Sequence, residues 1–186
     1  MRGLVVGSGG REHAILSTLK RTSRAPLELY CAPGNGGISQ IAQCFPISAA
    51  DHSALIELAR SLKIDLTIVG PEGPLAEGLV DEFERSGLKI MGPTLAASRL
   101  EASKAFAKDF MRRHQIPTAD YAVADSAGEA LAVLRSGRFG PPGSPVVIKA
   151  DGLAAGKGVV VARSRAEAER AVRPVLAYEP SLVGAR

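Results

Sequence analysis

The chain has 186 residues, of which 46% are hydrophobic and 23% are charged, and its net charge is +4. This length suits one domain, or one domain and part of another, and the apolar content excludes an intrinsically disordered chain. No apolar run reaches the roughly 18 residues that span a membrane, and residues 1–7 indicate entry into a strand, not a signal peptide.

The distribution of basic, aromatic and cysteine residues indicates which kinds of partner the protein has. Basic residues are dispersed and aromatic residues make up only 4%, so no basic stripe or stacking platform for nucleic acid is visible. Two cysteines, Cys31 and Cys44, give neither a disulfide framework nor a CxxC metal spacing. We therefore expect a cytoplasmic protein with reduced thiols that acts on small molecules, without nucleic acid or membrane partners.

The first 92 residues alternate between strand and helix patterns. Apolar runs predict strands over 2–7, 27–31, 65–70 and 88–91, and the segments between them predict helices over 11–20, 51–62 and 75–85. In the clearest helix, Leu55, Leu58 and Leu62 recur on one face and Asp51 is a good N-cap. Short strands separated by such helices are typical of βαβ units, so we expect an α/β fold with a doubly wound parallel sheet.

The pattern changes after Gly92-Pro93. The predicted elements are a helix over 95–114, a strand over 121–124, a helix over 125–134, and strands over 146–149 and 159–162. Ser164 and Glu167 indicate a capping box for a last helix, which we expect Pro174 to end.

A glycine-rich turn, GSGGREH over residues 7–13, joins the first strand to the first helix. Backbone N–H groups and a helix N-terminus favour an anion there, and Arg11 adds a cation, so phosphate binding is favoured over a plain tight turn. A dinucleotide fingerprint needs a third glycine where Glu12 stands, and Cys31-Ala32 lacks the acidic residue that holds a ribose. A nicotinamide cofactor is therefore disfavoured.

A second loop, GPEGPL over residues 70–75, also follows a strand. Ligands of open parallel sheets lie beyond the carboxyl ends of strands, so this loop and the Gly7 loop should border one site. Glu72 can accept hydrogen bonds from a ribose or an amine, although a solvated Glu72 on a proline-stiffened turn is as good an interpretation. Residues 35–37 follow the second strand and border the same site on weaker grounds.

A third motif, KADGLAAGKG over residues 149–158, joins one strand to another. It is not a Walker A loop, because three residues separate Gly152 from Gly156 and Gly158 stands in place of Ser/Thr. A hairpin loop this rich in glycine can fold over phosphates, to which Lys149 and Lys157 would add positive charge. We favour this interpretation over an ordinary mobile hairpin.

Several segments in the same order resemble motifs of the phosphoribosylamine–glycine ligase family, within the ATP-grasp superfamily. They are VVGSGGREHA, APGNGG, VGPEGPLAEGLVD, SKAFAKDFM with IPTA, and VIKADGLAAGKGVVVA, and they extend to about residue 175. The resemblance implies ATP-dependent ligation of glycine to 5-phosphoribosylamine through a glycyl phosphate, with Mg²⁺, in purine biosynthesis.

The resemblance also implies residue roles and a domain order. The ATP-binding residues it implies are Lys104, Lys149, Asp151, Gly152, Gly156, Lys157 and Gly158, and the substrate-binding residues are Gly9, Gly10, Arg11 and Glu72. It implies a doubly wound domain over residues 1–100 and an incomplete ATP-grasp region over 101–186. Residues 173–186 do not match the family's continuation, which supplies an adenine-contacting hinge and the Mg²⁺ ligands. We therefore expect no catalytic or metal-binding residue in this chain and no turnover by the chain alone.

Two other functions stay open. Another ATP-grasp ligase, such as a carboxylase-type subunit, would also pair a doubly wound domain with a glycine-rich lid. A non-catalytic module that binds a ribose phosphate would account for the missing metal ligands.

Overall fold

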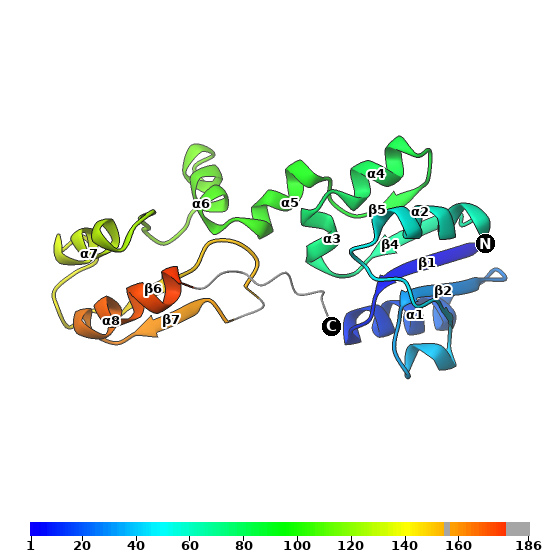
Figure 1. Cartoon of the computed structure of the whole chain (residues 1–186), viewed down its shortest axis with the longest axis horizontal. Helices are drawn as coiled ribbons and strands as arrows, with labels where there is room; N and C mark the ends of the chain where they lie inside the picture. Colours follow the sequence, from blue (N-terminus) through cyan, green and yellow to red (C-terminus); the bar gives the residue numbers. More distant parts are fainter. Residues whose placement is uncertain (155–156, 178–186) are drawn as a thin grey trace. The chain divides into compact units, whose positions relative to one another are not determined.

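The computed structural model describes residues 1–154 and 157–177. The described residues form two compact units, residues 1–99 and 100–177 (Figure 1). The first is built on a parallel sheet and the second carries an antiparallel hairpin. Within the described ranges, no helix combines the length and the hydropathy that a membrane span requires.

The sheet of the first unit has five parallel strands in the order β3-β2-β1-β4-β5. The strands are β1 (Arg2–Gly7), β2 (Glu28–Pro33), β3 (Gln43–Cys44), β4 (Leu66–Val69) and β5 (Ile90–Met91). The helices are α1 (Gly10–Thr22), the 3-10 turn η1 (Ile38–Gln40), α2 (His52–Ser61), α3 (Glu72–Ala76) and α4 (Leu79–Arg85), and α5 (Leu95–Ala102) begins in this unit and ends in the second. The predicted doubly wound sheet is confirmed, and β3 is too short to carry a readable pattern.

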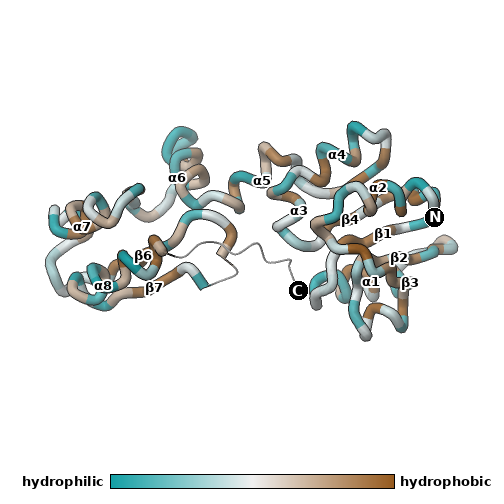
Figure 2. The backbone as a smooth tube through the Cα atoms, viewed as in Figure 1, coloured by the Kyte–Doolittle hydropathy of each residue, from teal (hydrophilic) through white to brown (hydrophobic). Residues whose placement is uncertain are grey.

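The central strand β1 is buried on both faces, as its unbroken apolar run predicts. Leu4 and Val6 pack in one cluster with Leu55 of α2 and Phe83 of α4. Val5 packs in a second cluster that includes residues of α1 and η1. Figure 2 shows the apolar character of β1 between these layers. Because the strands are parallel, the loops after β1, β2 and β4 leave the same edge of the sheet.

One helix of the first unit differs from the prediction. The helix expected over 75–85 is two helices, α3 and α4, separated at Gly78. Gly78 has φ +92°, a left-handed conformation that glycine adopts without steric cost. The Asp51 cap is confirmed, because its carboxylate accepts the Ala54 N–H at 3.0 Å.

The second unit packs two helices on a hairpin. Its elements are α6 (Lys104–Arg113), α7 (Ala127–Arg135), β6 (Val146–Lys149), β7 (Val159–Ala162) and α8 (Arg165–Leu176). The predicted strands 146–149 and 159–162 are confirmed as an antiparallel pair. Val146, Ala162 and Leu134 form the buried core of this unit with Ala168 and Val172 of α8.

The helix predicted over 95–114 is interrupted. Ser103 has an extended backbone, and its Oγ accepts the Phe106 N–H at 3.1 Å, so α6 begins after it as a separate helix. A serine hydroxyl that satisfies a first-turn N–H is a strong N-cap. The Ala-rich sequence on both sides hides this break.

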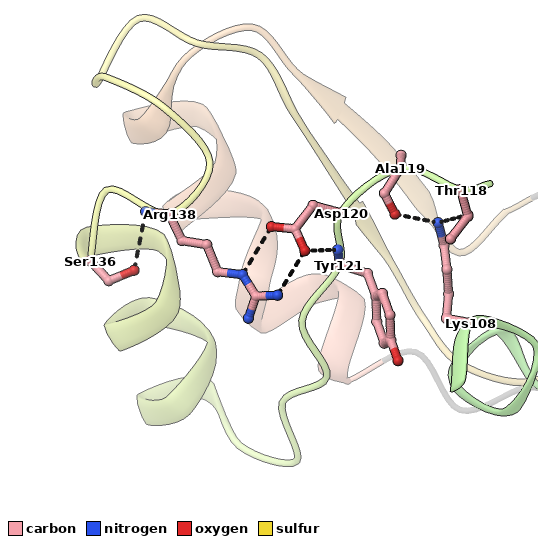
Figure 3. Close-up of polar contacts among 7 residues, drawn as sticks. All are labelled: Lys108, Thr118, Ala119, Asp120, Tyr121, Ser136 and Arg138. Atoms are coloured by element: carbon pink, nitrogen blue, oxygen red, sulfur yellow. Dashed lines mark hydrogen bonds and ion pairs between the residues drawn. The ribbon is translucent and has the colours of Figure 1, made fainter. Parts of the chain in front are cut away.

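The strand predicted over 121–124 is wrong, because this segment pairs with no other strand. Side chains instead hold the residues that precede it, including the Ala119 carbonyl, which accepts from Lys108 Nζ at 2.9 Å (Figure 3). Lys108 Nζ donates to the Thr118 hydroxyl at 2.6 Å, and the Arg138 guanidinium donates to both Asp120 oxygens at 3.0 and 2.7 Å. The apolar pattern of the segment is typical of a strand, but among the described residues no strand forms backbone pairs with it.

The last helix continues past the proline that was expected to end it. Pro174 lies inside α8, which extends to Leu176. Proline removes one N–H of the helix, but Val172 and Val175 are buried on either side of it and hold the final turn against the unit. The Ala177 N–H bonds the Arg173 carbonyl at 2.9 Å and closes the helix.

Ser164 caps α8 as predicted, because its Oγ accepts the Glu167 N–H at 3.3 Å. We expect Ser164→Ala to lower the free energy of unfolding of the second unit by about 1 kcal/mol, since the N–H loses its acceptor. Ser164→Asp keeps an acceptor oxygen and should cost much less. Hydrogen exchange at the α8 amides measures both variants, and equal losses for the two would contradict a capping role.

Candidate functional site

The loops after β1 and β4 contact each other through Arg11. Its guanidinium donates a hydrogen bond to the Gly70 carbonyl and lies 3.5 Å from the Glu72 carboxylate. Arg11 stands in the first turn of α1, and Glu72 is the first residue of α3. Two substrate-binding residues implied by the resemblance are therefore neighbours, and both side chains are about half exposed or more, at 63% and 49%.

A buried carboxylate lies behind these loops. Glu12 is 4% exposed, and its carboxylate accepts the Gly9 N–H at 2.5 Å. A side chain on Gly7 or Gly70 would collide with Glu12, so both glycines are required by close approach to it. Glu12 thus fills the space that the third glycine of a dinucleotide fingerprint would leave open. It also occupies the Gly9 N–H, one of the groups predicted to face an anion.

The loop after β2 joins the same cluster. The Asn35 side chain donates to the Ser8 carbonyl at 2.8 Å and accepts the N–H groups of Gly37 and Ile38, each at 2.9 Å. Gly10, the first residue of α1, is exposed, and its N–H has no carbonyl in a preceding turn to bond. The edge of the sheet thus keeps an open helix N-terminus beside the Arg11 side chain.

In the second unit, the glycine-rich segment is tied to the start of α6. The Lys104 ammonium donates to the Gly152 carbonyl at 2.7 Å, and the Asp151 carboxylate accepts the N–H groups of Lys104 and Ala105 at 2.6 and 3.2 Å. Asp151 also accepts the Ser103 hydroxyl at 2.9 Å. Gly152 has φ +88°, which favours glycine at this position. Three residues implied for the ATP site therefore lie together.

The Asp151 carboxylate is held in its charged form. Partial burial raises its pKa, but hydrogen bonds from Ser103 and from the N–H groups of Ala105, Gly152 and Lys104 outweigh that effect, and the pKa lies below its usual value. The negative charge is therefore present at neutral pH, next to the α6 N-terminus that favours it.

The other residues implied for ATP binding take up separate positions on the hairpin. Lys149 ends β6 opposite Val159, and both Lys149 and Lys157 are exposed. Gly158 is buried, and its carbonyl accepts the Ala150 N–H at 2.7 Å. Gly156 lies outside the described residues. Among residues 1–154 and 157–177, no interaction joins the Lys149 or Lys157 side chain to the cluster around Asp151.

Neither the cluster around Arg11 nor the cluster around Asp151 includes a cysteine or, among the described residues, a group of metal ligands. Cys31 and Cys44 are both free thiols. Burial raises the pKa of Cys31 to about 12, so this thiol stays protonated in the core. In the part of the chain that the structure describes, no group of three or more His, Cys, Asp or Glu residues is placed to hold a metal ion.

Sequence reasoning missed two residues of these clusters. Glu12 entered only as a departure from a nucleotide-binding pattern, although Glu three residues after an N-cap is the usual signal for a carboxylate that folds back on the helix start. Ser103 stood inside the helix predicted over 95–114 and began the SKAFAKDFM motif, but its role as an N-cap was not recognised, although serine at a helix start is a common cap.

The family models match both units. Residues 1–101 match the model described as "Phosphoribosylglycinamide synthetase, N domain", and residues 102–181 match "Phosphoribosylglycinamide synthetase, ATP-grasp (A) domain". The chain belongs to the phosphoribosylglycinamide synthetase family. The family resemblance drawn from the motifs is thereby confirmed, and so is the expected combination of a doubly wound sheet with an ATP-grasp region.

Several relatives carry the name phosphoribosylamine–glycine ligase. The chain is 52% identical over 169 residues to a phosphoribosylamine–glycine ligase of Caldanaerobacter subterraneus, covering 91% of this chain and 39% of the relative. It is 51% identical over 181 residues to that of Escherichia coli K12, covering 95% and 40%. The crystal structure of phosphoribosylamine–glycine ligase from Thermotoga maritima aligns with a TM-score of 0.70 and 31% identity, over 91% of this chain and 38% of that one. The chain thus spans about two fifths of the length of these relatives.

Proposed function

We propose that this chain supplies the amine-substrate and ATP-phosphate parts of a ligase that joins glycine to 5-phosphoribosylamine. The observation that carries the proposal is the identity of about one half to relatives named for this reaction, over nearly the whole chain. The contact of Lys104 with Gly152 supports it, because it places a cation against the loop that would cover the phosphates. The reaction would be cytoplasmic and confined to small molecules.

The chemistry requires an activated carboxylate. The glycine carboxylate attacks the γ-phosphorus of ATP, ADP leaves, and a glycyl phosphate forms. The amine of 5-phosphoribosylamine then attacks the glycyl carbonyl carbon, loses a proton and expels phosphate, which gives glycinamide ribonucleotide. Both steps develop negative charge on phosphoryl oxygens, so clustered cations are needed.

The second unit would hold the ATP phosphates. Lys104, Lys149 and Lys157 would donate to phosphate oxygens, with Gly152, Gly156 and Gly158 in the covering loop. ATP-grasp enzymes use ATP with Mg²⁺, whose role is to neutralise the transferring phosphoryl group. We assign no metal ligand and no catalytic residue to the described part of this chain.

The first unit would hold the ribose phosphate. Its anion would meet the Gly10 N–H and the Arg11 side chain, with Gly9 shaping the loop, since the Gly9 N–H is already taken by Glu12. Glu72, which pairs with Arg11, would be left to accept from a ribose hydroxyl or the amine.

A chimera tests the proposal. In it, this chain replaces the matched segment of the Escherichia coli relative. We expect ADP release that depends on both glycine and 5-phosphoribosylamine. A folded chimera that binds ATP but releases ADP only with bicarbonate would indicate a carboxylase-type ligase instead.

A direct binding measurement on the chain itself tests the proposal even if the chimera does not fold. Calorimetry on the 186-residue chain should detect glycinamide ribonucleotide, with weaker binding for Arg11→Ala and unchanged binding for Arg21→Ala, an exposed arginine on the same helix. Binding without any turnover in a folded chimera would favour a ribose-phosphate-binding module. No binding at all would contradict the proposal.

A further inference from the structure

The contacts of Asp151 set it apart from the other residues implied for the ATP site. Its carboxylate receives donors from three consecutive residues at the start of α6: the Ser103 hydroxyl and the N–H groups of Lys104 and Ala105, between 2.6 and 3.2 Å. A carboxylate has about four lone-pair sites, so most of its acceptor capacity is used within the chain: Oδ1 holds two donors and Oδ2 holds one.

These three contacts limit what Asp151 can do. A carboxylate beside ATP phosphates would repel them unless a metal ion lay between. A metal ion on Oδ1 would displace two first-turn N–H groups that need an acceptor, and a metal ion on Oδ2 would compete with the Ser103 hydroxyl. Direct contact with the nucleotide or its metal is therefore the less favourable role.

The second half of the contact is made by Lys104. Its backbone N–H bonds Asp151, and its ammonium bonds the Gly152 carbonyl at 2.7 Å. Lys104 thus contacts two consecutive residues of the glycine-rich segment: Asp151 through its backbone N–H and Gly152 through its ammonium. An ammonium has three donors, so the bond to Gly152 leaves two of them for phosphate oxygens.

We propose that Asp151 is a positioning residue that clamps the start of the glycine-rich loop to α6 and thereby fixes the Lys104 ammonium for the ATP phosphates. The proposal rests on the proposed function for its kinetic part only. The clamp itself is a property of the chain and can be measured without turnover.

The first test uses the 186-residue chain. In Asp151→Ala, the Lys104 and Ala105 amides lose their acceptor, so their hydrogen exchange should speed up by about tenfold or more, as expected for a lost hydrogen bond to a charged group. Asp151→Asn keeps an oxygen in the Oδ1 position that both amides use and should retain most of the protection. The Ala54 amide, capped by Asp51 in the other unit, is the internal control.

The second test uses the chimera with ATP and Mg²⁺ varied separately. We expect Asp151→Ala to raise KM for ATP roughly tenfold, Asp151→Asn to raise it by less than about threefold, and the Mg²⁺ concentration for half-maximal rate to stay unchanged. Ser103→Ala combined with Asp151→Ala should cost less than the sum of the two single changes, because both break one clamp.

The outcomes separate the two proposals. Equal damage by Asp151→Asn and Asp151→Ala, with a raised Mg²⁺ requirement, would overturn the positioning role and make Asp151 a metal ligand. Unchanged amide exchange in Asp151→Ala would show that the clamp does not exist. Lost protection together with a chimera that never uses glycine would keep the clamp and reject the ligase.

Discussion

Lys149→Ala in the chimera should lower kcat/KM for ATP by about ten- to a hundredfold and leave that for 5-phosphoribosylamine nearly unchanged. The loss of one charge-assisted hydrogen bond to a phosphate costs roughly 1.5–3 kcal/mol. Lys149 is exposed at the end of the strand that leads into the glycine-rich segment, so its ammonium is available to an anion there.

Arg11→Ala should show the opposite selectivity, with the loss confined to 5-phosphoribosylamine. Its guanidinium lies in the first unit beside the open N-terminus of α1. Steady-state kinetics with one substrate varied at a time measures both changes, and Lys89→Ala is the control for removal of a lysine elsewhere. Equal effects of both substitutions on both substrates would mean that the two phosphate sites are assigned wrongly.

Gly70→Ala should destabilise the first unit by about 3 kcal/mol, the upper range for overpacking a well-packed site. A Cβ on Gly70 would lie 1.9 Å from a carboxylate oxygen of Glu12. Glu12 is buried and cannot retreat without breaking its bond to the Gly9 N–H. Urea denaturation of the 186-residue chain measures the loss.

Gly73→Ala is the matched control, three residues along. Apart from its two chain neighbours, no atom lies within 4 Å of a Cβ built there, so the added methyl crowds only the following Pro74 and this change should cost clearly less than Gly70→Ala. Combining Gly70→Ala with Glu12→Ala should cost less than the sum of the single changes. Similar stabilities for the Gly70 and Gly73 variants would show that Glu12 does not define this packing.

The fold was largely predictable because its signals are local. The run Leu4-Val5-Val6 indicates a strand buried on both faces, and the glycine-rich turn between two apolar runs indicates the β6–β7 hairpin. Where a prediction was wrong, contacts between residues far apart in the sequence determined the local structure. The strand pattern over 121–124 has no partner strand, and the neighbouring Asp120 is held by Arg138, 18 residues away.

The residue types of the site were predictable from the sequence, but the contacts between these residues were not. Glycines and lysines in sequence indicate phosphate binding, yet nothing local indicates that Asp151 reaches the start of α6, 46 to 48 residues back along the chain. Likewise, the burial of Glu12 follows from the close approach of the β1 and β4 loops, which only the assembled sheet brings about. Such tertiary contacts distinguish a residue that binds from one that positions.

Oxygen transfer from glycine tests the central claim most directly. The chimera is given glycine labelled with ¹⁸O in its carboxylate, ATP and 5-phosphoribosylamine, and the released phosphate is analysed by mass spectrometry. If ligation proceeds through a glycyl phosphate, the bridging oxygen leaves with phosphorus, and each phosphate carries one ¹⁸O. Phosphate without ¹⁸O, released while glycinamide ribonucleotide forms, would contradict the account.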